Sequence, residues 1–391
     1  MSKAVIAAAV RTALGNEGGS LRDIPAEDLS ALVISEVVKR AGLRPQELED
    51  VIWGQCLGEG GNHARLALLK AGLPVTVPGF TLNRQCASGL EAINLAAQAI
   101  LLGQANAVVA GGVESMTRQP YMLERPSRPY QRIPPRFIWG PLSPPEIGDP
   151  PMGITAENLA ERYEITREMQ DEFAFRSHRL AFAAIEAGRF RDEIIPVSVP
   201  QKKGPPLLLD TDEHPRPDTS LEKLNALPPV FKSGGTVTAG NSSGIADGAA
   251  ATLILSDEKA SQLGLTPLAT IRASSVVGVD PNIMGIAPSF AIPKVLTKLG
   301  LGLEDMDLLE INEAFAAQVL AVFKESDLSS FMERINVNGG AIALGHPIGC
   351  TGCRLVVTLS HEMARRGCRY GLVTLCAGGG QGMAMVIERE S

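Results

Sequence analysis

The sequence has no uninterrupted apolar run long enough to cross a lipid bilayer. Even the apolar residues 90–112 are broken by polar side chains, namely Glu91, Asn94, Gln98, Gln104 and Asn106. The opening "MSKAVIAAAVRTALG" faintly resembles a signal peptide, but its apolar run is short and no cleavage site follows it. We therefore expect a first strand here, no membrane association and a cytoplasmic location.

A surplus of positive charge is also missing. The 391 residues include 36 lysines and arginines against 43 aspartates and glutamates, which gives a formal net charge of −7. Proteins that bind nucleic acid or an anionic membrane surface typically carry a basic excess. We therefore expect no nucleic-acid partner.

Cysteine is scarce, because the chain has only 6 and these are too scattered for a disulfide framework. Cys350 and Cys353, in "GCTGC", have the C-x-x-C spacing of a redox pair or of half a zinc site. No second C-x-x-C and no histidine pair with ligand spacing accompanies them. We expect these two to be small buried residues at the start of a helix, and no metal site.

Apolar residues suffice for a sizeable core, since 45% of the chain is hydrophobic and its length suggests two or three domains. Strand-like and helix-like segments alternate in the first part. The predicted strands are 4–10, 50–55, 79–84 and 106–111, and the predicted helices are 26–41, 63–71 and 87–102. This rhythm predicts a largely parallel α/β sheet with helices on both faces.

The middle of the chain has a different character. Residues 117–151 are rich in proline and arginine, 154–187 resemble a pair of helices, and 199–229 are again irregular. Irregular stretches of this length are typically functional loops or lids. A disordered linker is the alternative, but the amphipathic pattern of 167–187 favours a docked subdomain.

The two ends of the chain look like copies of one unit. The first has a strand, the turn at Cys86, a helix and the strand "AVVAGG". The last has a predicted strand "INVNGG" (335–340), the turn "GHPIGCTG", a helix to Arg366 and the strand "GLVTLCAGGG". A duplicated α/β unit would bring these loops together at the carboxyl ends of the strands, where ligands of α/β proteins bind.

Residues 81–92, "TLNRQCASGLEA", put Cys86 at the mouth of a predicted helix. A free cysteine often serves as a small core residue. Alternatively, the positive end of the helix dipole favours the thiolate form and thus a nucleophile. Residues 81–92 alone leave both interpretations open.

Four stretches together resemble the thiolase family closely: "NRQCASG" around Cys86, "NEAFA" at 312–316, "GHP" at 345–347 and "CAGGG" at 376–380. Four further stretches agree: "AGGVESM" (110–116), "MGITAENLA" (152–160), "GTVTAGNSSGIADGAAA" (235–251) and "NGGAIALGHPIG" (338–349). The resemblance covers essentially the whole chain, in the family's order and spacing.

This resemblance implies a thiolase fold, with duplicated α/β halves stacked as α-β-α-β-α layers and an inserted loop domain. It implies an N-terminal half of residues 1–117 and 245–266, a CoA-binding loop domain of 118–244, and a C-terminal half of 267–391. The implied reaction is reversible acyl transfer, acyl-CoA + acetyl-CoA = CoA + 3-oxoacyl-CoA. Coenzyme A thioesters are its substrates, and no metal or redox cofactor is expected.

By motif match, Cys86 is expected to be the nucleophile, since a thiol is nucleophilic and its pKa of roughly 8.5 is easily lowered. His346 is expected to take its proton and then to help hold charge on a thioester oxygen. Cys376 resembles the family's second cysteine, which moves the proton of the α carbon.

Two oxyanion holes are implied as well. The backbone N–H groups of Cys86 and Gly378 would form one, because a glycine permits close approach of the backbone. Asn312 would position a water that forms the other together with His346. Glu313 is expected to support this loop and not to transfer protons.

Coenzyme A is a polyanion and must meet local positive charge on an acidic protein, which the two irregular insertion stretches offer. The resemblance implies that Ser243 hydrogen-bonds the pantetheine arm and that Arg216 lies near the adenine and phosphate end. Met152 and Phe315 are the other expected substrate-binding residues.

Several alternatives stay open. Ketoacyl synthases and hydroxymethylglutaryl-CoA synthase share the fold, but Cys376 in a C-x-G turn favours a thiolase. A non-catalytic acyl-CoA or lipid carrier would be expected to have lost a catalytic residue. Pro151 and "NRQC" favour a degradative 3-oxoacyl-CoA thiolase of fatty acid metabolism over a biosynthetic acetoacetyl-CoA thiolase. A homodimer or homotetramer is expected.

Overall fold

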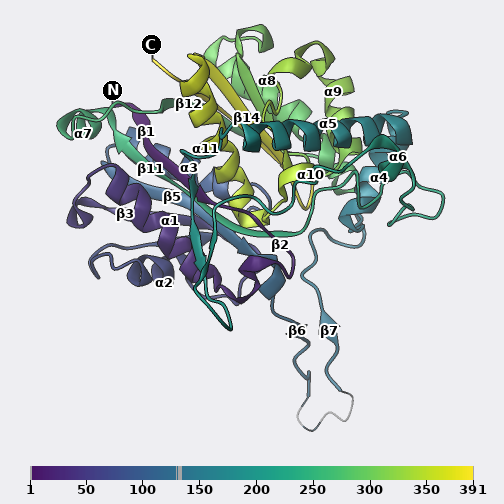
Figure 1. The fold of residues 1–391 in the computed structure, drawn as a ribbon, viewed down its shortest axis with the longest axis horizontal. Helices are drawn as coiled ribbons and strands as arrows, with labels where there is room; N and C mark the ends of the chain where they lie inside the picture. Colours follow the sequence, from purple (N-terminus) through teal and green to yellow (C-terminus); the bar gives the residue numbers. More distant parts are fainter. Residues whose placement is uncertain (1, 129, 131–133, 391) are drawn as a thin grey trace.

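The computed structural model describes residues 2–128, 130 and 134–390. Most of its strands join one sheet (Figure 1). In spatial order they are β13 (Leu308–Ile311), β14 (Tyr370–Ala377), β15 (Gln381–Glu388), β12 (Ala269–Gly278), β1 (Ala4–Thr12), β11 (Ala246–Ser256), β5 (Ala107–Ser115), β3 (Asp50–Gly54) and β4 (Phe80–Leu82). Two short strands, β2 (Gly15–Asn16) and β8 (Ile194–Ile195), pair with β11 and β1.

The sheet is mixed, so the prediction of a largely parallel sheet is wrong. Among the nine strands in the spatial order above, the pairs β3–β4, β3–β5 and β13–β14 are parallel and the others are antiparallel. Parallel pairs occur where a helix connects the strands. The glycine turn 378–380 instead sends β15 directly back along β14, with Gly379 at φ 80° and Gly380 at φ 79°.

Two halves meet where β1 pairs with β12, through only the pairs Val5–Thr270 and Ile6–Ala269. The outer face of the first half is covered by α1 (Ala26–Arg40) and α2 (His63–Lys70). Helices α3 (Ser88–Leu101) and α11 (Ile348–Arg366) lie between the halves, and α8 (Pro288–Leu299) and α9 (Ala316–Glu325) cover the second half. The predicted α-β-α-β-α layering is therefore confirmed.

Side chains of β14 alternate between its two faces, so this strand packs against helices on both sides. Val373, Leu375 and Ala377 pack into the central core with α3 and α11. Leu372 and Cys376 point the other way, into the core beneath α8 and α9. Successive side chains of a strand alternate between its faces, so the sequence of β14 puts Cys376 opposite its immediate neighbours.

The predicted strand 335–340 does not form. Asn336 has a left-handed backbone with φ 48°, and only Ile335 makes a bridge, to Leu309 of β13. The Asn336 side chain accepts a hydrogen bond from the N–H of Ile311 and donates one to its carbonyl, both at 2.8 Å. A side-chain amide thus replaces a neighbouring strand beside β13.

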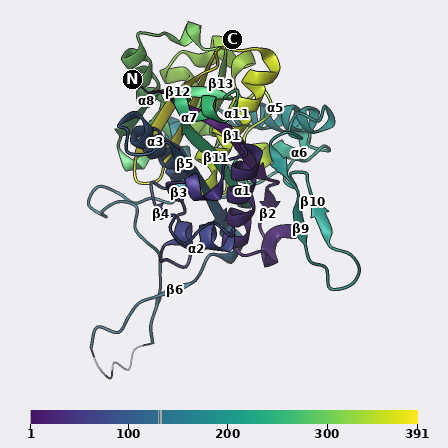
Figure 2. The same cartoon turned by 90° about the vertical axis from the view of Figure 1, so that its left-hand side faces the viewer.

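Between β5 and β11 lies a long insertion, which contains the predicted helix pair as α4 (Met152–Arg162) and α5 (Arg167–Glu186). It also has two hairpins that the sequence did not indicate, β6 (Met122–Leu123) with β7 (Phe137–Ile138), and β9 (Val197–Val199) with β10 (Leu207–Leu209). Both hairpins project from the body (Figures 1 and 2). A short helix, α6 (Leu221–Asn225), and a further one, α7 (Asp257–Gln262), flank β11 in the sequence, and α10 (Ala341–Leu344) precedes α11.

Within the described ranges, no helix combines the length and the apolar character that a membrane span requires.

Candidate active site

Cys86 lies in the tight turn between β4 and α3. The preceding Gln85 has a left-handed backbone with φ 48°, and its N–H donates to the Asn83 side chain at 2.8 Å. The Ser88 hydroxyl donates to the carbonyl of Gln85 at 2.7 Å and accepts from the N–H of Arg84 at 2.8 Å. These local hydrogen bonds fix the turn and thus the direction of the Cys86 side chain.

The Cys86 sulfur accepts hydrogen bonds from the N–H of Gly378 and from its own N–H, which lower the pKa of the thiol. Burial has the larger effect and raises the pKa of Cys86 to about 11. The expectation that the helix mouth favours the thiolate is therefore wrong for this site without substrate. Cys86 is a neutral thiol, which needs a base to become a nucleophile.

His346 precedes α11, and its hydrogen bonds define which nitrogen carries the proton. Its Nδ1 lies 2.7 Å from the hydroxyl oxygen of Thr351. The Thr351 hydroxyl proton is given to the carbonyl of Pro347 at 2.9 Å, so its oxygen accepts the proton of Nδ1. The lone pair of Nε2 then accepts a hydrogen bond from the Asn312 amide at 3.4 Å.

Burial and the positive charge of Arg354 lower the pKa of His346 to about 3. The imidazole is therefore neutral near neutral pH, as a base that receives a proton must be.

Cys376 is fully buried near the end of β14. Burial, followed by the nearby Cys86 sulfur, raises the pKa of this thiol strongly. Asn312 follows β13 directly, and its N–H donates to the carbonyl of Thr374 at 3.0 Å, on the same strand as Cys376. The second cysteine is thus a protonated group beside the first.

Backbone contacts bring the predicted loops together. The N–H of Ser243 donates to the carbonyl of Ala314 at 3.0 Å, which joins "GNSSG" to "NEAFA". The N–H of His346 donates to the carbonyl of Gly244 at 2.9 Å. A side chain at Gly89 would lie 2.9 Å from the carbonyl oxygen of Gly349, so glycine permits the starts of α3 and α11 to touch.

Glu313 has the structural role expected of it. Its carboxylate accepts hydrogen bonds from the Ser177 hydroxyl at 2.6 Å, the Asn336 amide at 2.8 Å and the N–H of Ile342 at 3.2 Å. These three contacts join the loop of Asn312 to α5 and to α10.

The predicted substrate residues fall into two groups. Phe315 is buried and meets Phe231 edge to face at 6.0 Å, and the half-buried Met152 packs into the same apolar cluster. Ser243 is half-buried, and its neighbour Ser242 forms a β-bridge with Phe315.

Arg216 is exposed and lines a separate pocket of about 220 Å³ with His178, His214 and Lys223. This pocket also reaches Gly240 and Ile342, but its lining includes none of Cys86, His346, Asn312 and Cys376.

Some residues of the site were missed at the sequence level. Thr351 could have been suspected from a hydroxyl one turn into the helix that follows His346. Leu142 of the insertion lies against the glycine turn, where a side chain at Gly378 would be 2.9 Å from its Cδ1 atom. The glycines of "CAGGG" predicted a close approach, but nothing in the sequence indicated which segment approaches.

Cys350 and Cys353 are free and buried in the first turns of α11, as predicted.

Comparisons with known proteins cover the whole chain. The family described as "Thiolase, N-terminal domain" matches residues 4–258, and "Thiolase, C-terminal domain" matches residues 265–389. An acetyl-CoA acetyltransferase of Chromobacterium violaceum is 53% identical over 390 residues, which cover 98% of this chain and 99% of that protein. A probable acetyl-CoA acyltransferase of Staphylococcus aureus is 48% identical, with 100% of both chains covered.

Two solved structures are similar to the whole chain. The Bacillus anthracis acetyl-CoA acetyltransferase has a TM-score of 0.94 at 50% identity and covers 100% of this chain and 99% of its own. The human mitochondrial 3-ketoacyl-CoA thiolase has a TM-score of 0.94 at 43% identity, with the same coverage of both chains.

Proposed function

This chain belongs to the thiolase family, and from this premise we propose that it is an acyltransferase whose acyl intermediate forms on Cys86. The reaction is acyl-CoA + acetyl-CoA = CoA + 3-oxoacyl-CoA in either direction. One observation supports the site above the others: two backbone N–H groups, of Gly378 and of Cys86 itself, surround the Cys86 sulfur. Donors in that position can stabilise an oxyanion that forms when the sulfur attacks a carbonyl.

In the cleavage direction, the Cys86 thiol gives its proton to Nε2 of His346 as its sulfur attacks the 3-oxo carbonyl carbon. The bond between the α and β carbons then breaks, and the Cys376 thiol gives its proton to the α carbon. Acetyl-CoA leaves, and the acyl group stays on the Cys86 sulfur as a thioester. Burial, which keeps Cys376 protonated, suits this role as an acid.

In the second half, the thiol of coenzyme A gives its proton to the Cys376 thiolate. Its sulfur attacks the acyl carbon, the bond from that carbon to Cys86 breaks, and His346 returns the proton to Cys86. Each protonated group has then been restored. His346 and a water positioned by Asn312 are proposed as the second oxyanion site, and the Asn312 amide lies 3.4 Å from Nε2 of His346.

Residues 118–244 are proposed as the loop domain that binds coenzyme A. Arg216, with Lys223 and two histidines around it, offers donors for the phosphate end. Ser243 is proposed for the pantetheine arm, and Met152 and Phe315 for the acyl end, since both lie in an apolar cluster. A cytoplasmic location, a homodimer or homotetramer, and a place in fatty acid metabolism belong to the same proposal.

We further propose a degradative type that accepts acyl chains longer than acetoacetyl. Pro151 caps α4 next to Met152, so the chain has no polar side chain at this position. A strictly acetoacetyl-specific enzyme of the biosynthetic type is the alternative, and kcat/KM over 3-oxoacyl-CoA substrates of increasing length separates the two. A non-catalytic carrier of the same fold would show no turnover at any length.

The roles of Cys86 and Cys376 can be distinguished by the half-reaction that each variant loses. Cys376→Ala should still exchange acetyl groups between coenzyme A molecules, because in exchange no α carbon is protonated and the proton that His346 takes from Cys86 can pass to the leaving coenzyme A sulfur and return by the same route. The variant should nevertheless lose cleavage by about 10²–10⁴-fold, since cleavage requires a proton for the α carbon. Cys86→Ala should lose both reactions. Near-normal cleavage by Cys376→Ala, or acetyl exchange by Cys86→Ala, would contradict the mechanism.

A further inference from the structure

Glu114 is a buried carboxylate to which the proposed reaction gives no role. It is the second-last residue of β5, and its side chain is 1% exposed. Oε2 accepts hydrogen bonds from the N–H groups of Cys56 and Gly349, and Oε1 accepts one from the N–H of Leu57, all at 3.0 Å. Burial raises the pKa of Glu114, and the three N–H donors act in the opposite direction, toward the ionised form.

These donors come from two separate segments. Cys56 and Leu57 follow β3, on the same side as the Cys86 turn. Gly349 is the second residue of α11 and lies three residues after His346. One oxygen atom, Oε2, therefore joins the segment after β3 to the segment that carries His346.

The segment after β3 continues to Cys86 through Cys56. The Cys56 thiol donates to the carbonyl of Gln85 at 3.2 Å, and its sulfur lies 3.3 Å from the Ser88 hydroxyl. Gln85 is the left-handed residue directly before Cys86. The chain of contacts from Glu114 to Cys86 thus contains two hydrogen bonds and one peptide unit.

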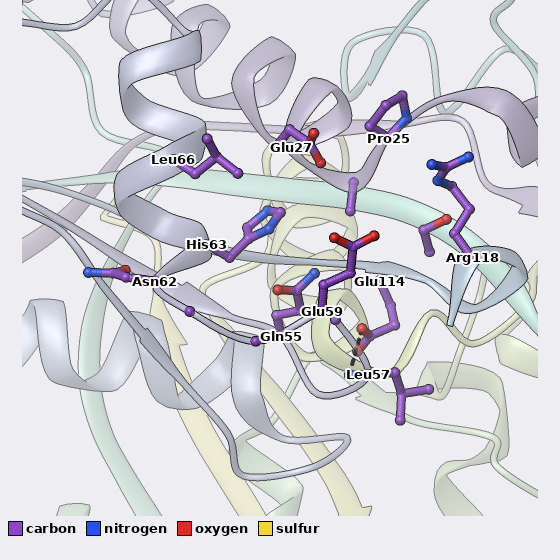
Figure 3. Close-up of a pocket in the computed structure, with 15 residues that line it drawn as sticks. Pro25, Glu27, Gln55, Leu57, Glu59, Asn62, His63, Leu66, Glu114 and Arg118 are labelled. Carbon is purple, nitrogen blue, oxygen red and sulfur yellow. Dashed lines mark hydrogen bonds between the residues drawn. The ribbon is translucent and has the colours of Figure 1, made fainter. Parts of the chain in front are cut away.

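Burial is the main reason that the pKa of the Cys86 thiol is raised, and the charge of Glu114 acts in the same direction. Its carboxylate lies in a pocket of about 310 Å³ together with Gln55, His63 and Arg118 (Figure 3). The lining of this pocket does not include Cys86 or His346. Glu114 thus lines the pocket and, through its hydrogen bonds, contacts both the segment after β3 and the start of α11.

We propose that Glu114 is a positioning residue of the proposed thiolase reaction, which sets the placement of the Cys86 turn relative to the His346 turn. A misplacement of about 1 Å between reacting groups can cost about 10²-fold in rate. The proposal rests on the proposed function, because it assigns Glu114 to the reaction of Cys86 and His346.

A carboxylate suits this task better than an amide. Glu114→Gln keeps the length of the side chain but turns one acceptor into a donor, which then faces an N–H group. Glu59→Gln is the matched control, because Glu59 is an exposed residue that lines the same pocket. Two kinetic readouts are needed, kcat with KM for cleavage and the pH midpoint of iodoacetamide alkylation at Cys86, mapped by peptide mass.

For Glu114→Gln we expect kcat to fall about 10–100-fold with KM changed less than about threefold, because positioning acts on the reacting groups. We also expect the alkylation midpoint of Cys86 to move to lower pH, since a negative charge has been removed. The other titratable groups that act with Cys86 are Cys56, Cys376 and, in the proposed reaction, the base His346, and all three remain. Glu59→Gln should match the unmodified protein in both readouts.

An unchanged kcat, or a lower kcat with an unchanged alkylation midpoint, would overturn the proposal. If Glu114→Gln does not fold, Cys56→Ala and Cys56→Ser replace it. Cys56→Ala should lower kcat, and Cys56→Ser, which keeps a donor for Gln85, should restore most of it; equal rates for the two would overturn the proposal. Alkylation needs no turnover, and failure of the proposed function would instead appear as no acylation of the unmodified protein.

Discussion

At the scale of single residues, the site depends on which nitrogen of His346 carries a proton. Thr351 decides this, because its own proton is used on Pro347 and its oxygen can only accept from Nδ1. The lone pair of Nε2 is then directed to the Asn312 amide. A buried histidine with a pKa near 3 is a weak base, so its orientation matters for proton transfer from Cys86.

Thr351→Val should lower kcat for cleavage by about 10-fold, because the Nδ1–H group loses its acceptor and the ring its fixed orientation. Thr351→Ser keeps the hydroxyl and should stay within about threefold of the unmodified protein. Steady-state kcat of purified variants measures both. Equal rates for Val and Ser would contradict the role given to Thr351.

At the scale of elements, β1 holds the insertion through one buried arginine. Arg11 is fully buried and donates to both oxygens of Asp212, at 2.7 and 2.9 Å, and to Glu193 at 2.6 Å. Asp212 also accepts from the N–H of Leu14. Asp212 and Glu193 belong to the insertion, so this network fixes the proposed CoA-binding segment to the sheet.

Asp212→Asn should lower the free energy of unfolding by about 3–5 kcal/mol, because it leaves the Arg11 charge buried with one anion fewer. Asp218→Asn is the control, since Asp218 forms an exposed ion pair with Lys223. The control should cost less than about 1 kcal/mol. Urea unfolding of both variants tests this, and similar losses in the two would refute the anchoring role.

At the scale of the whole molecule, buried histidines link stability to pH. Burial lowers the pKa of His63 and His178 to about 4 and that of His346 to about 3. The unfolded chain binds these protons near pH 6.5, so the stability they contribute is complete above pH 6.5 and is lost as the pH falls toward 4. Glu310 has the opposite effect on stability. Burial raises its pKa to about 8, so the stability that it contributes is present at low pH and is lost as the pH rises toward 8.

His63→Gln isolates one of these contributions, because His63 makes its hydrogen bond with Ser30, away from the catalytic turns. Between pH 6 and pH 5 the variant should lose about 1 kcal/mol less unfolding free energy than the unmodified protein. Chemical unfolding at both pH values gives this difference. The same loss in both proteins would show that His63 is not neutral in the folded state.

Much of this molecule was predictable from its sequence. The motifs around Cys86, Asn312, His346 and Cys376 indicated the residues of the proposed site, and alternation along the chain identified most of its strands and helices. Strand direction was not predictable, because a three-glycine turn and a long insertion reverse strands without any change in their apolar pattern. The strand predicted at 335–340 failed because Asn336 uses its side chain for hydrogen bonds that a strand would make with its backbone.

The sequence did not predict the raised pKa of Cys86. Its position before α3 suggested a thiolate, but burial exceeds the effect of the nearby N–H donors. Burial depends on the approach of segments far apart in the chain, such as Leu142 at the glycine turn. Local sequence could therefore indicate Cys86 as the proposed nucleophile but not its protonation state.

The central claim is that Cys86 carries the acyl group, and one measurement tests it most directly. The protein is mixed briefly with acetyl-CoA, quenched in acid and digested, and its peptides are mapped by mass. The account predicts an added acetyl group on the peptide that contains Cys86, and none on that peptide from Cys86→Ala. Acetyl on the peptide of Cys350 and Cys353, or on no cysteine peptide, would contradict it.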